Sequence, residues 1–162
     1  MAIRWTARVQ IAAPRDRVYA ALTDLDSPRE WLPSLVKLEQ LTAGGFGAGT
    51  RWREHRKFKS HTAHEVFEVV AADAPNGFEV YVDGKLGTTG SGYYRYVYAL
   101  ETTPAGTAVT LDGVAGGGGW LAALLATVLA PLLRRMMARL FSRDLEALKA
   151  HLEKRTGAWG RA

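Results

Sequence analysis

The chain has 162 residues and no cysteine, which excludes disulfide bonds, thiolate metal ligands and cysteine nucleophiles. Hydrophobic residues make up 48% of it and charged residues 23%, a balance typical of one globular domain that is long enough to bury a core. The net charge of +5 is spread along the chain rather than concentrated, and no nucleic-acid-binding motif accompanies it, so we expect no nucleic acid partner.

Polar and apolar residues alternate over residues 4–12, which predicts a strand with one buried face. Two short helices are expected next, over residues 15–24 and 27–32, because Pro14 and Pro28 suit the first turn of a helix and Ser27 is a favourable N-cap. Short turns then separate six further predicted strands, at residues 35–42, 50–58, 60–72, 78–82, 91–101 and 107–115.

The longest predicted element is a helix over residues 120–155. Its later apolar residues recur every three or four positions, which marks one face of a helix: Leu133, Met137, Phe141, Leu145, Leu148 and Leu152. Residues 121–133 carry no charge and are apolar on all sides. This part favours either a core helix gripped by the sheet or a surface that docks on a membrane or a partner. Pro131 removes one helical hydrogen bond and is expected to kink the helix.

The connections between the predicted strands are of hairpin length, which implies an antiparallel sheet. One long helix across such a sheet gives an α+β domain. We therefore predict a curved antiparallel sheet of about seven strands around the long C-terminal helix, with two short helices between the first two strands. The domain is expected to span residues 1–156, with residues 157–162 as a C-terminal tail. A sheet this wide leaves space beside one helix, which side chains fill or which forms a cavity.

Several local motifs accompany this order of elements. They are Ala13–Tyr19, Leu22–Asp24, Trp31, Gly47–Thr50, Glu65–Val70 with Ala74-Pro75, Gly106–Leu111 and Asp144–Lys149. With these motifs the chain resembles the START-like, or SRPBCC, superfamily, and within it the polyketide cyclase/dehydrase and lipid-transport family. The resemblance implies a helix-grip fold over nearly the whole chain. It leaves the function open, since the family includes lipid and hormone carriers as well as aromatase/cyclases.

The predicted strand over residues 91–101 places Tyr94, Tyr96 and Tyr98 on one face. These tyrosines are candidates to line an apolar cavity and orient a ligand through their hydroxyls, or else they pack in the core. The resemblance places Trp31 beside the mouth of that cavity; the alternative is an aromatic residue that seals the helices to the sheet. The candidate cavity residues are completed by Trp52, Phe67, Leu125 and Leu129.

Alternation over residues 50–58 puts Trp52, Glu54, Arg56 and Phe58 on one face. If the two aromatic residues point inward, Glu54 and Arg56 are carried in with them, and a buried carboxylate and guanidinium have to pair. Such a pair is either structural or a device that holds a ligand carbonyl or activates an enol. Glu54 and Arg56 are therefore candidate catalytic residues, without a reaction assigned to them.

The first expectation for function is the binding or transport of a hydrophobic small molecule (a lipid, a polyketide or another apolar or aromatic ligand) between the sheet and the helix. No cofactor is expected, and no metal, because His61 and His64 are three residues apart on one strand and so face opposite ways. One alternative is a cyclase, aromatase or dehydratase for a polyketide-like substrate. Another is a docking module that acts through residues 121–133.

The expected setting is the cytoplasm, because there is no cysteine and no apolar run of signal-peptide length near Met1. The expected assembly is a monomer or a homodimer. A peripheral membrane contact through the apolar part of the last helix remains an alternative, since the arginines that follow it suit anionic headgroups.

Overall fold

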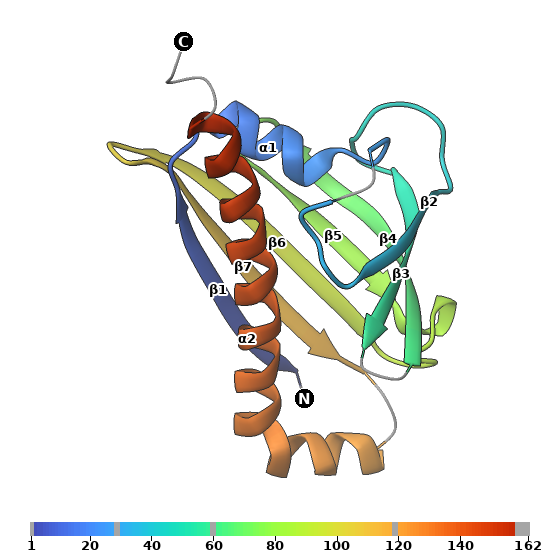
Figure 1. Cartoon of the computed structure of the whole chain (residues 1–162). Helices are drawn as coiled ribbons and strands as arrows, with labels where there is room; N and C mark the ends of the chain where they lie inside the picture. The colour runs from blue at the N-terminus through green and yellow to red at the C-terminus, as the bar shows by residue number, and fades with distance from the viewer. Residues whose placement is uncertain (1, 28–29, 59–60, 118–119, 158–162) are drawn as a thin grey trace.

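The computed structural model of the chain describes residues 2–27, 30–58, 61–117 and 120–157, with the side chains of residues 120–127 and 155–157 left out. The elements follow one another along the chain (Figure 1) as β1 (Ile3–Ile11), α1 (Arg15–Thr23), β2 (Leu35–Gln40), β3 (Arg51–Phe58), β4 (His61–Asp73), β5 (Gly77–Asp83), the 3-10 helix η1 (Gly84–Leu86), β6 (Tyr93–Thr103), β7 (Gly106–Gly116) and α2 (Trp120–Gly157). Helix α2 thus includes the first residue of the expected tail, and residues 158–162 lie outside the described residues.

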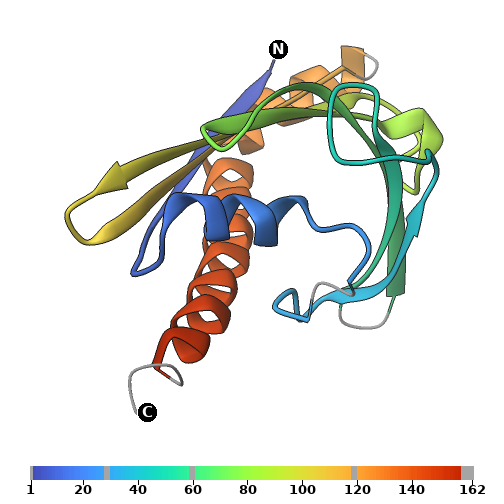
Figure 2. The same cartoon turned by 90° about the horizontal axis from the view of Figure 1, so that it is seen from above.

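The strands form one seven-stranded antiparallel sheet in the order β1-β7-β6-β5-β4-β3-β2. Strands β2 to β7 form a meander, in which neighbours in sequence are neighbours in the sheet. β1 pairs with β7, so β1 and β2 are the two edge strands. Figure 2 shows the sheet curving around a space in which α1 and α2 lie. The predicted α+β class and the helix-grip arrangement are therefore confirmed.

The second predicted short helix, over residues 27–32, is wrong for the residues that the structure describes there. Asp26 and Ser27 form bends, and Glu30 and Trp31 form a turn. The Asp24 carboxylate accepts hydrogen bonds from the backbone N–H groups of Asp26 and Ser27, both at 3.0 Å. An aspartate side chain that bonds the next backbone N–H groups competes with helix formation and favours a turn.

The helix and the sheet meet in a core that buries the later part of the predicted apolar stripe of α2. Phe141, Leu145, Leu148 and Leu152 all belong to the core cluster. Trp5 of β1 stacks on Phe141, with ring centroids 5.8 Å apart. Gly113 lies opposite Trp5 in the β1–β7 ladder, and a Cβ at this position would come within 2.2 Å of the indole ring. The absence of a side chain at Gly113 therefore lets the indole lie flat on the sheet.

Helix α2 is continuous from Trp120 to Gly157 and contains Pro131. Figure 1 shows a sharp bend between a short first segment and the long remainder, in the orange part of the helix that includes Pro131. This agrees with the kink expected from proline. Within the described part of the chain, no helix combines the length and the apolar character needed to cross a membrane.

The charged stretch on β3 presents its polar face on the convex side of the sheet, where Glu39 of β2 neutralises part of it. Glu39 Oε2 lies 3.2 Å from Arg53 Nη1 and 3.3 Å from His55 Nε2, and the carboxylate also pairs with Lys37 Nζ. The hydrogen bonds from Lys37 and His55 lower the pKa of Glu39 from 4.5 to about 2. Glu39 therefore offsets part of the positive charge that gathers on this face of β3.

Leu148 is fully buried, with 0% of its surface exposed. Leu148→Ala is expected to lower the free energy of unfolding by about 2–5 kcal/mol, because buried methyl groups are lost and a cavity remains. Leu132 lies on the same helix but is 64% exposed, so Leu132→Ala should change this free energy by less than about 0.5 kcal/mol. Urea unfolding of both variants measures the difference, and equal effects would contradict the assignment of the buried face.

The lowered pKa of Glu39 makes stability depend on pH. The folded carboxyl has a pKa of about 2 against 4.5 in the reference state, so its contribution is complete above pH 4.5 and is lost as the pH falls toward 2. Glu39→Gln should therefore lower the urea midpoint at neutral pH, and the gap from the natural chain should close in acid. Glu101→Gln, an exposed position on β6, is the matched control; the same pH-dependent gap in that variant would refute the assignment.

Candidate functional site

A small inner cavity of about 80 Å³ lies between the concave face of the sheet, the end of α1 and helix α2. Aromatic side chains form most of its wall, and a carboxylate and a guanidinium interrupt it. The lining residues are Leu22, Trp31, Leu32, Trp52, Glu54, Arg56, Phe67, Phe78, Val80, Tyr96, Tyr98 and Phe141. The sequence left open which face of β3 points inward; in the structure the face with Trp52, Glu54 and Arg56 lines this cavity.

The aromatic wall is built by cross-strand pairing. Trp52 and Phe67 are direct partners in the β3–β4 ladder, and their rings stack with centroids 5.2 Å apart. Tyr96 of β6 follows, with its ring centroid 6.3 Å from that of Phe67 and 5.1 Å from that of Phe141 on α2. Aromatic neighbours on one sheet face stabilise each other and leave little room to shift. The result is a rigid wall from β3 to the helix.

An outer cavity of about 190 Å³ adjoins the inner one. Both are lined by Glu54, Arg56, Phe67, Tyr96 and Phe141, so these five side chains lie between two neighbouring lobes. The other residues around the outer cavity come from β3 to β6, the loop before β6 and α2: Phe58, Ala63, Glu65, Val82, Thr89, Tyr94, Met137 and Leu140. The polar pair at the centre is therefore within reach of both lobes.

Arg56 is held by helix α2 across the cavity wall. Its Nη2 donates to Asp144 Oδ2 at 2.7 Å, and its Nε donates to Ser34 Oγ at 2.8 Å. Burial alone would lower the pKa of Arg56, but the Asp144 carboxylate outweighs it and raises that pKa; the nearby Glu54 carboxylate adds to the rise. At Asp144 burial has the larger effect and raises the carboxyl pKa, which Arg56 opposes in part. The pair keeps two charges in a largely buried place.

The sequence predicted Glu54 as the partner of a buried Arg56. The structure corrects this: the ion pair of Arg56 is made with Asp144, and Glu54 adds an electrostatic contribution. Only 4% of Glu54 is exposed, and its Oε1 accepts a hydrogen bond of 3.0 Å from Trp52 Nε1. Asp144 is 88 positions away in sequence, and spacing along one strand carries no information about such a contact.

Tyr96 is the tyrosine most strongly affected by its surroundings. Burial raises the pKa of its phenol well above 10, and the neighbouring Tyr98 and Tyr94 add to the rise. The phenol is therefore protonated at neutral pH and remains a hydrogen-bond donor. Together the central residues offer a guanidinium, a neutral phenol and a carboxylate inside an otherwise aromatic enclosure, which is suited to orienting a carbonyl or phenolic oxygen.

Most of the cavity residues expected from the sequence meet around these two lobes. Trp31, Trp52, Phe67, Tyr96 and Tyr98 line the inner cavity, and Tyr94 lines the outer one. Leu129 lines neither and is 43% exposed. The side chain of Leu125 lies outside the described residues. Sequence reasoning missed Phe141, although its place on the apolar stripe of α2 was a usable signal, and it missed Phe78 and Val80 of β5.

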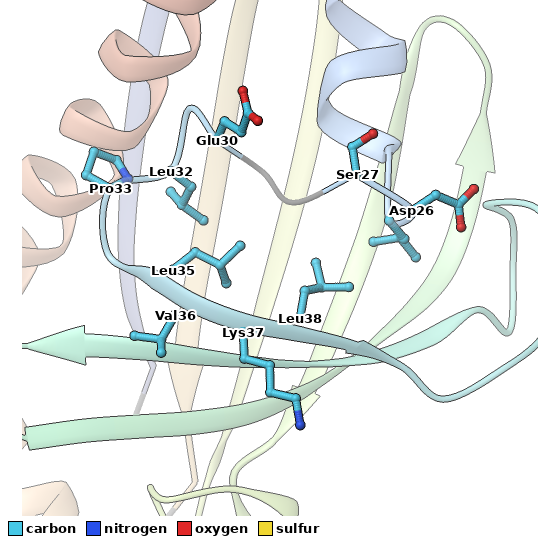
Figure 3. Close-up of a pocket in the computed structure, with 10 residues that line it drawn as sticks. Asp26, Ser27, Glu30, Leu32, Pro33, Leu35, Val36, Lys37 and Leu38 are labelled. Carbon is cyan, nitrogen blue, oxygen red and sulfur yellow. The ribbon is translucent and has the colours of Figure 1, made fainter.

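A third pocket, of about 430 Å³, lies outside this core, between the α1–β2 connection and edge strand β2. Figure 3 shows Leu32, Leu35 and Leu38 lining it, while the Glu30 carboxylate points away. Leu32 also lines the inner cavity, so this one side chain lies between the outside pocket and the inner lobe. Among the described residues, no group of three or more His, Asp or Glu side chains is placed to hold a metal ion.

Comparison with known proteins gives a family for this chain. The family model described as polyketide cyclase/dehydrase and lipid transport matches residues 2–153. A search of curated proteins gives no significant match.

Solved structures show where the same fold occurs. A Thermus thermophilus protein, TTHA0849, is 20% identical, with 93% of this chain and 95% of that chain covered and a TM-score of 0.68. The Polyketide_cyc-like protein Cgl2372 of Corynebacterium glutamicum is 20% identical, with 100% and 98% covered and a TM-score of 0.65. StfQ, a di-domain ARO/CYC protein from the steffimycin biosynthetic pathway, is 17% identical, with 97% of this chain and 52% of StfQ covered and a TM-score of 0.73. At these identities the likeness concerns the fold.

Removing only one partner of the Arg56–Asp144 ion pair should strongly destabilise the protein. Asp144→Leu leaves the Arg56 guanidinium in the wall without its direct partner, and the expected loss of unfolding free energy is about 3 kcal/mol, at the low end for buried pairs because Glu54 stays nearby. The double variant Arg56→Met with Asp144→Leu should recover most of that loss, since neither charge remains. Urea unfolding of the single and double variants checks this; a double variant as unstable as Asp144→Leu would contradict it.

Proposed function

The chain belongs to the polyketide cyclase/dehydrase and lipid transport family, and we propose that it binds a small aromatic molecule with a polar oxygen in the two adjoining cavities. The observation that supports this most directly is the composition of the shared wall. Arg56, Glu54 and Tyr96 lie among stacked aromatic rings, between the two lobes. Ligand sites are commonly apolar enclosures with a few convergent polar groups.

Cavity volume limits the size of the ligand. An apolar cavity of roughly 150 Å³ holds one benzene molecule, so the outer lobe of about 190 Å³ suits a single aromatic ring. The inner lobe of about 80 Å³ suits a substituent on that ring. Both lobes are smaller than the roughly 300–1,000 Å³ of pockets for drug-sized ligands. A long-chain lipid is therefore a poorer candidate than a one-ring or small two-ring compound.

The polar groups suggest the chemistry of the ligand. The Arg56 guanidinium and the neutral Tyr96 phenol both carry donors, while the Glu54 carboxylate accepts. A carbonyl oxygen would be oriented by the two donors, and a phenolic hydroxyl would donate to Glu54. The preferred ligand class is thus an aryl ketone, a phenol or a related polyketide fragment. The pocket of Figure 3 offers a route of access, because Leu32 lies between it and the inner lobe.

A cyclase or dehydratase reaction is the second candidate, and one observation favours it. Titratable side chains from β3 and β6 border both lobes, so a bound substrate would lie beside an acid, a base and a cation. Glu54 would remove a proton from the carbon adjacent to a substrate carbonyl, and Arg56 would stabilise the negative charge on the oxygen of the resulting enolate. The likeness to the ARO/CYC protein StfQ is compatible with this chemistry at the level of the fold.

We also propose a cytoplasmic location, for which the lack of cysteine is the support.

Filling the outer lobe tests the binding proposal. Ala63 borders this lobe, whereas Ala72 lies exposed on the same strand, so Ala63→Leu and Ala72→Leu make the same chemical change in two places. Titration with one-ring phenols and aryl ketones, followed by tryptophan fluorescence and native mass spectrometry, should give a complex with the natural chain. Ala63→Leu should weaken it by about tenfold or more, or about 1.4 kcal/mol, and Ala72→Leu should leave it unchanged.

Two outcomes would count against this function. If no compound of these classes binds the natural chain, and none is extracted with the purified protein, the proposal fails. If both leucine variants bind as the natural chain does, the ligand lies elsewhere on the surface. Conversion of a bound β-polyketone, abolished in Glu54→Gln without loss of binding, would favour the enzyme over the carrier.

A further inference from the structure

Helix α2 carries an exposed apolar patch around its bend. Val128 is 73% exposed, Leu132 is 64% exposed and Met136 is 55% exposed. Leu132 and Met136 are four positions apart and so share one face of the helix, and Val128 lies one such step earlier, before Pro131. Scattered apolar residues on a surface need no explanation, but a row of large ones on a single helix face marks an interaction site.

The same face becomes basic farther along the helix. Arg135, Arg139 and Arg143 follow at helical spacing from Leu132, and all three are exposed. The sequence from Trp120 to Arg143 contains no acidic residue, and Arg134 adds a fourth positive charge to it. The surface between the bend and Arg143 therefore joins an apolar row to a row of guanidinium groups.

An open groove on the outside of α2 lies at the basic end of this face. Ala138, Arg139, Ser142, Arg143 and Glu146 line it. Two guanidinium groups and a hydroxyl beside small side chains suit a phosphate group, which accepts hydrogen bonds from arginine. Glu146 at the far edge opposes an anion there, so the favourable end of the groove is the end at Arg139.

We propose that this face of α2 (Val128, Leu132, Met136, Arg135, Arg139 and Arg143, here called the docking face) binds the surface of an anionic membrane. An apolar row that enters the boundary between headgroups and acyl chains, next to arginines that meet anionic headgroups, is the pattern of helices that lie on membranes. A helix of this kind lies in the interface, so the proposed contact is peripheral. A second copy of the chain fits less well, because it brings another set of arginines to the same region.

Docking in this way would also place the ligand cavity near the bilayer. Met137, Leu140 and Phe141 border the outer cavity from the same stretch of α2 that carries the docking face on its other side. A hydrophobic compound dissolved in the membrane would then be close to the outer lobe. The membrane contact itself does not rest on the proposed ligand, and it is tested separately.

Sedimentation with lipid vesicles tests the docking face in the full chain. The protein is mixed with vesicles of phosphatidylcholine alone or of phosphatidylcholine with phosphatidylserine, at low and at high salt. Binding is expected to the mixed vesicles, stronger at low salt. Leu132→Glu should abolish it. The triple variant R135Q/R139Q/R143Q should weaken it by about fivefold for each arginine, or roughly a hundredfold in all.

Matched control variants distinguish binding through the docking face from attraction by the net positive charge of the protein. The triple variant R4Q/R8Q/R17Q removes three exposed arginines elsewhere, and Val36→Glu changes an exposed valine on β2; both should bind vesicles as the natural chain does. An equal loss in the two triple variants would overturn the proposal, because attraction would then depend on charge alone. Absence of binding to mixed vesicles would overturn it as well. So would a dimer in analytical ultracentrifugation that Leu132→Glu disrupts, since the face would then be an interface between copies.

Discussion

The ion pair between Arg56 and Asp144 is the contact on which the arrangement of the cavity depends. Helix α2 packs mainly along β1, at one edge of the sheet, whereas Arg56 lies on β3, next to the other edge. A direct bond of 2.7 Å between them requires the sheet to curve until β3 faces the helix. The charges are costly to bury, and burial raises the pKa of Asp144 despite its partner. Such a pair is better explained as a constraint on geometry than as a source of stability: it fixes where the helix lies over the aromatic wall.

Aromatic packing explains why a cavity survives beside this pair. Trp52, Phe67 and Tyr96 are held in a cross-strand series that ends against Phe141 of α2. Rings stacked on a sheet are stiff and do not adjust to fill every gap. The polar atoms of Glu54 and Arg56 need hydrogen-bonding partners in the same place, which prevents complete apolar filling. Two lobes remain on either side of the five side chains that line both, which are Glu54, Arg56, Phe67, Tyr96 and Phe141. The small volumes of the lobes explain our preference for a compact aromatic ligand over a lipid chain.

Local patterns in the sequence predicted much of the fold, because strands and helices leave short-range signals. Period-two alternation placed the strands and grouped the side chains of β3 into two faces, but it left open which face points inward. Steps of three and four placed Leu145 and Leu148 in the core. The short helix expected at residues 27–32 was wrong because the Asp24 side chain competes for backbone N–H groups. The partner of Arg56 lies 88 positions away and is determined by the curvature of the sheet. Leu129 lines neither lobe, and the proline predicts that a bend exists but not its direction.

The central claim is that the aromatic enclosure beside Arg56 and Glu54 binds a small ligand. The most direct measurement is an NMR titration of the methyl-labelled protein with an aryl ketone or phenol that binds it. The account predicts that the largest shifts occur at Val80, Val82 and Met137, which border the two lobes, while exposed methyl groups such as those of Val70 and Val97 stay unchanged. Saturable shifts confined to the exposed residues, with Val80, Val82 and Met137 unmoved, would contradict it.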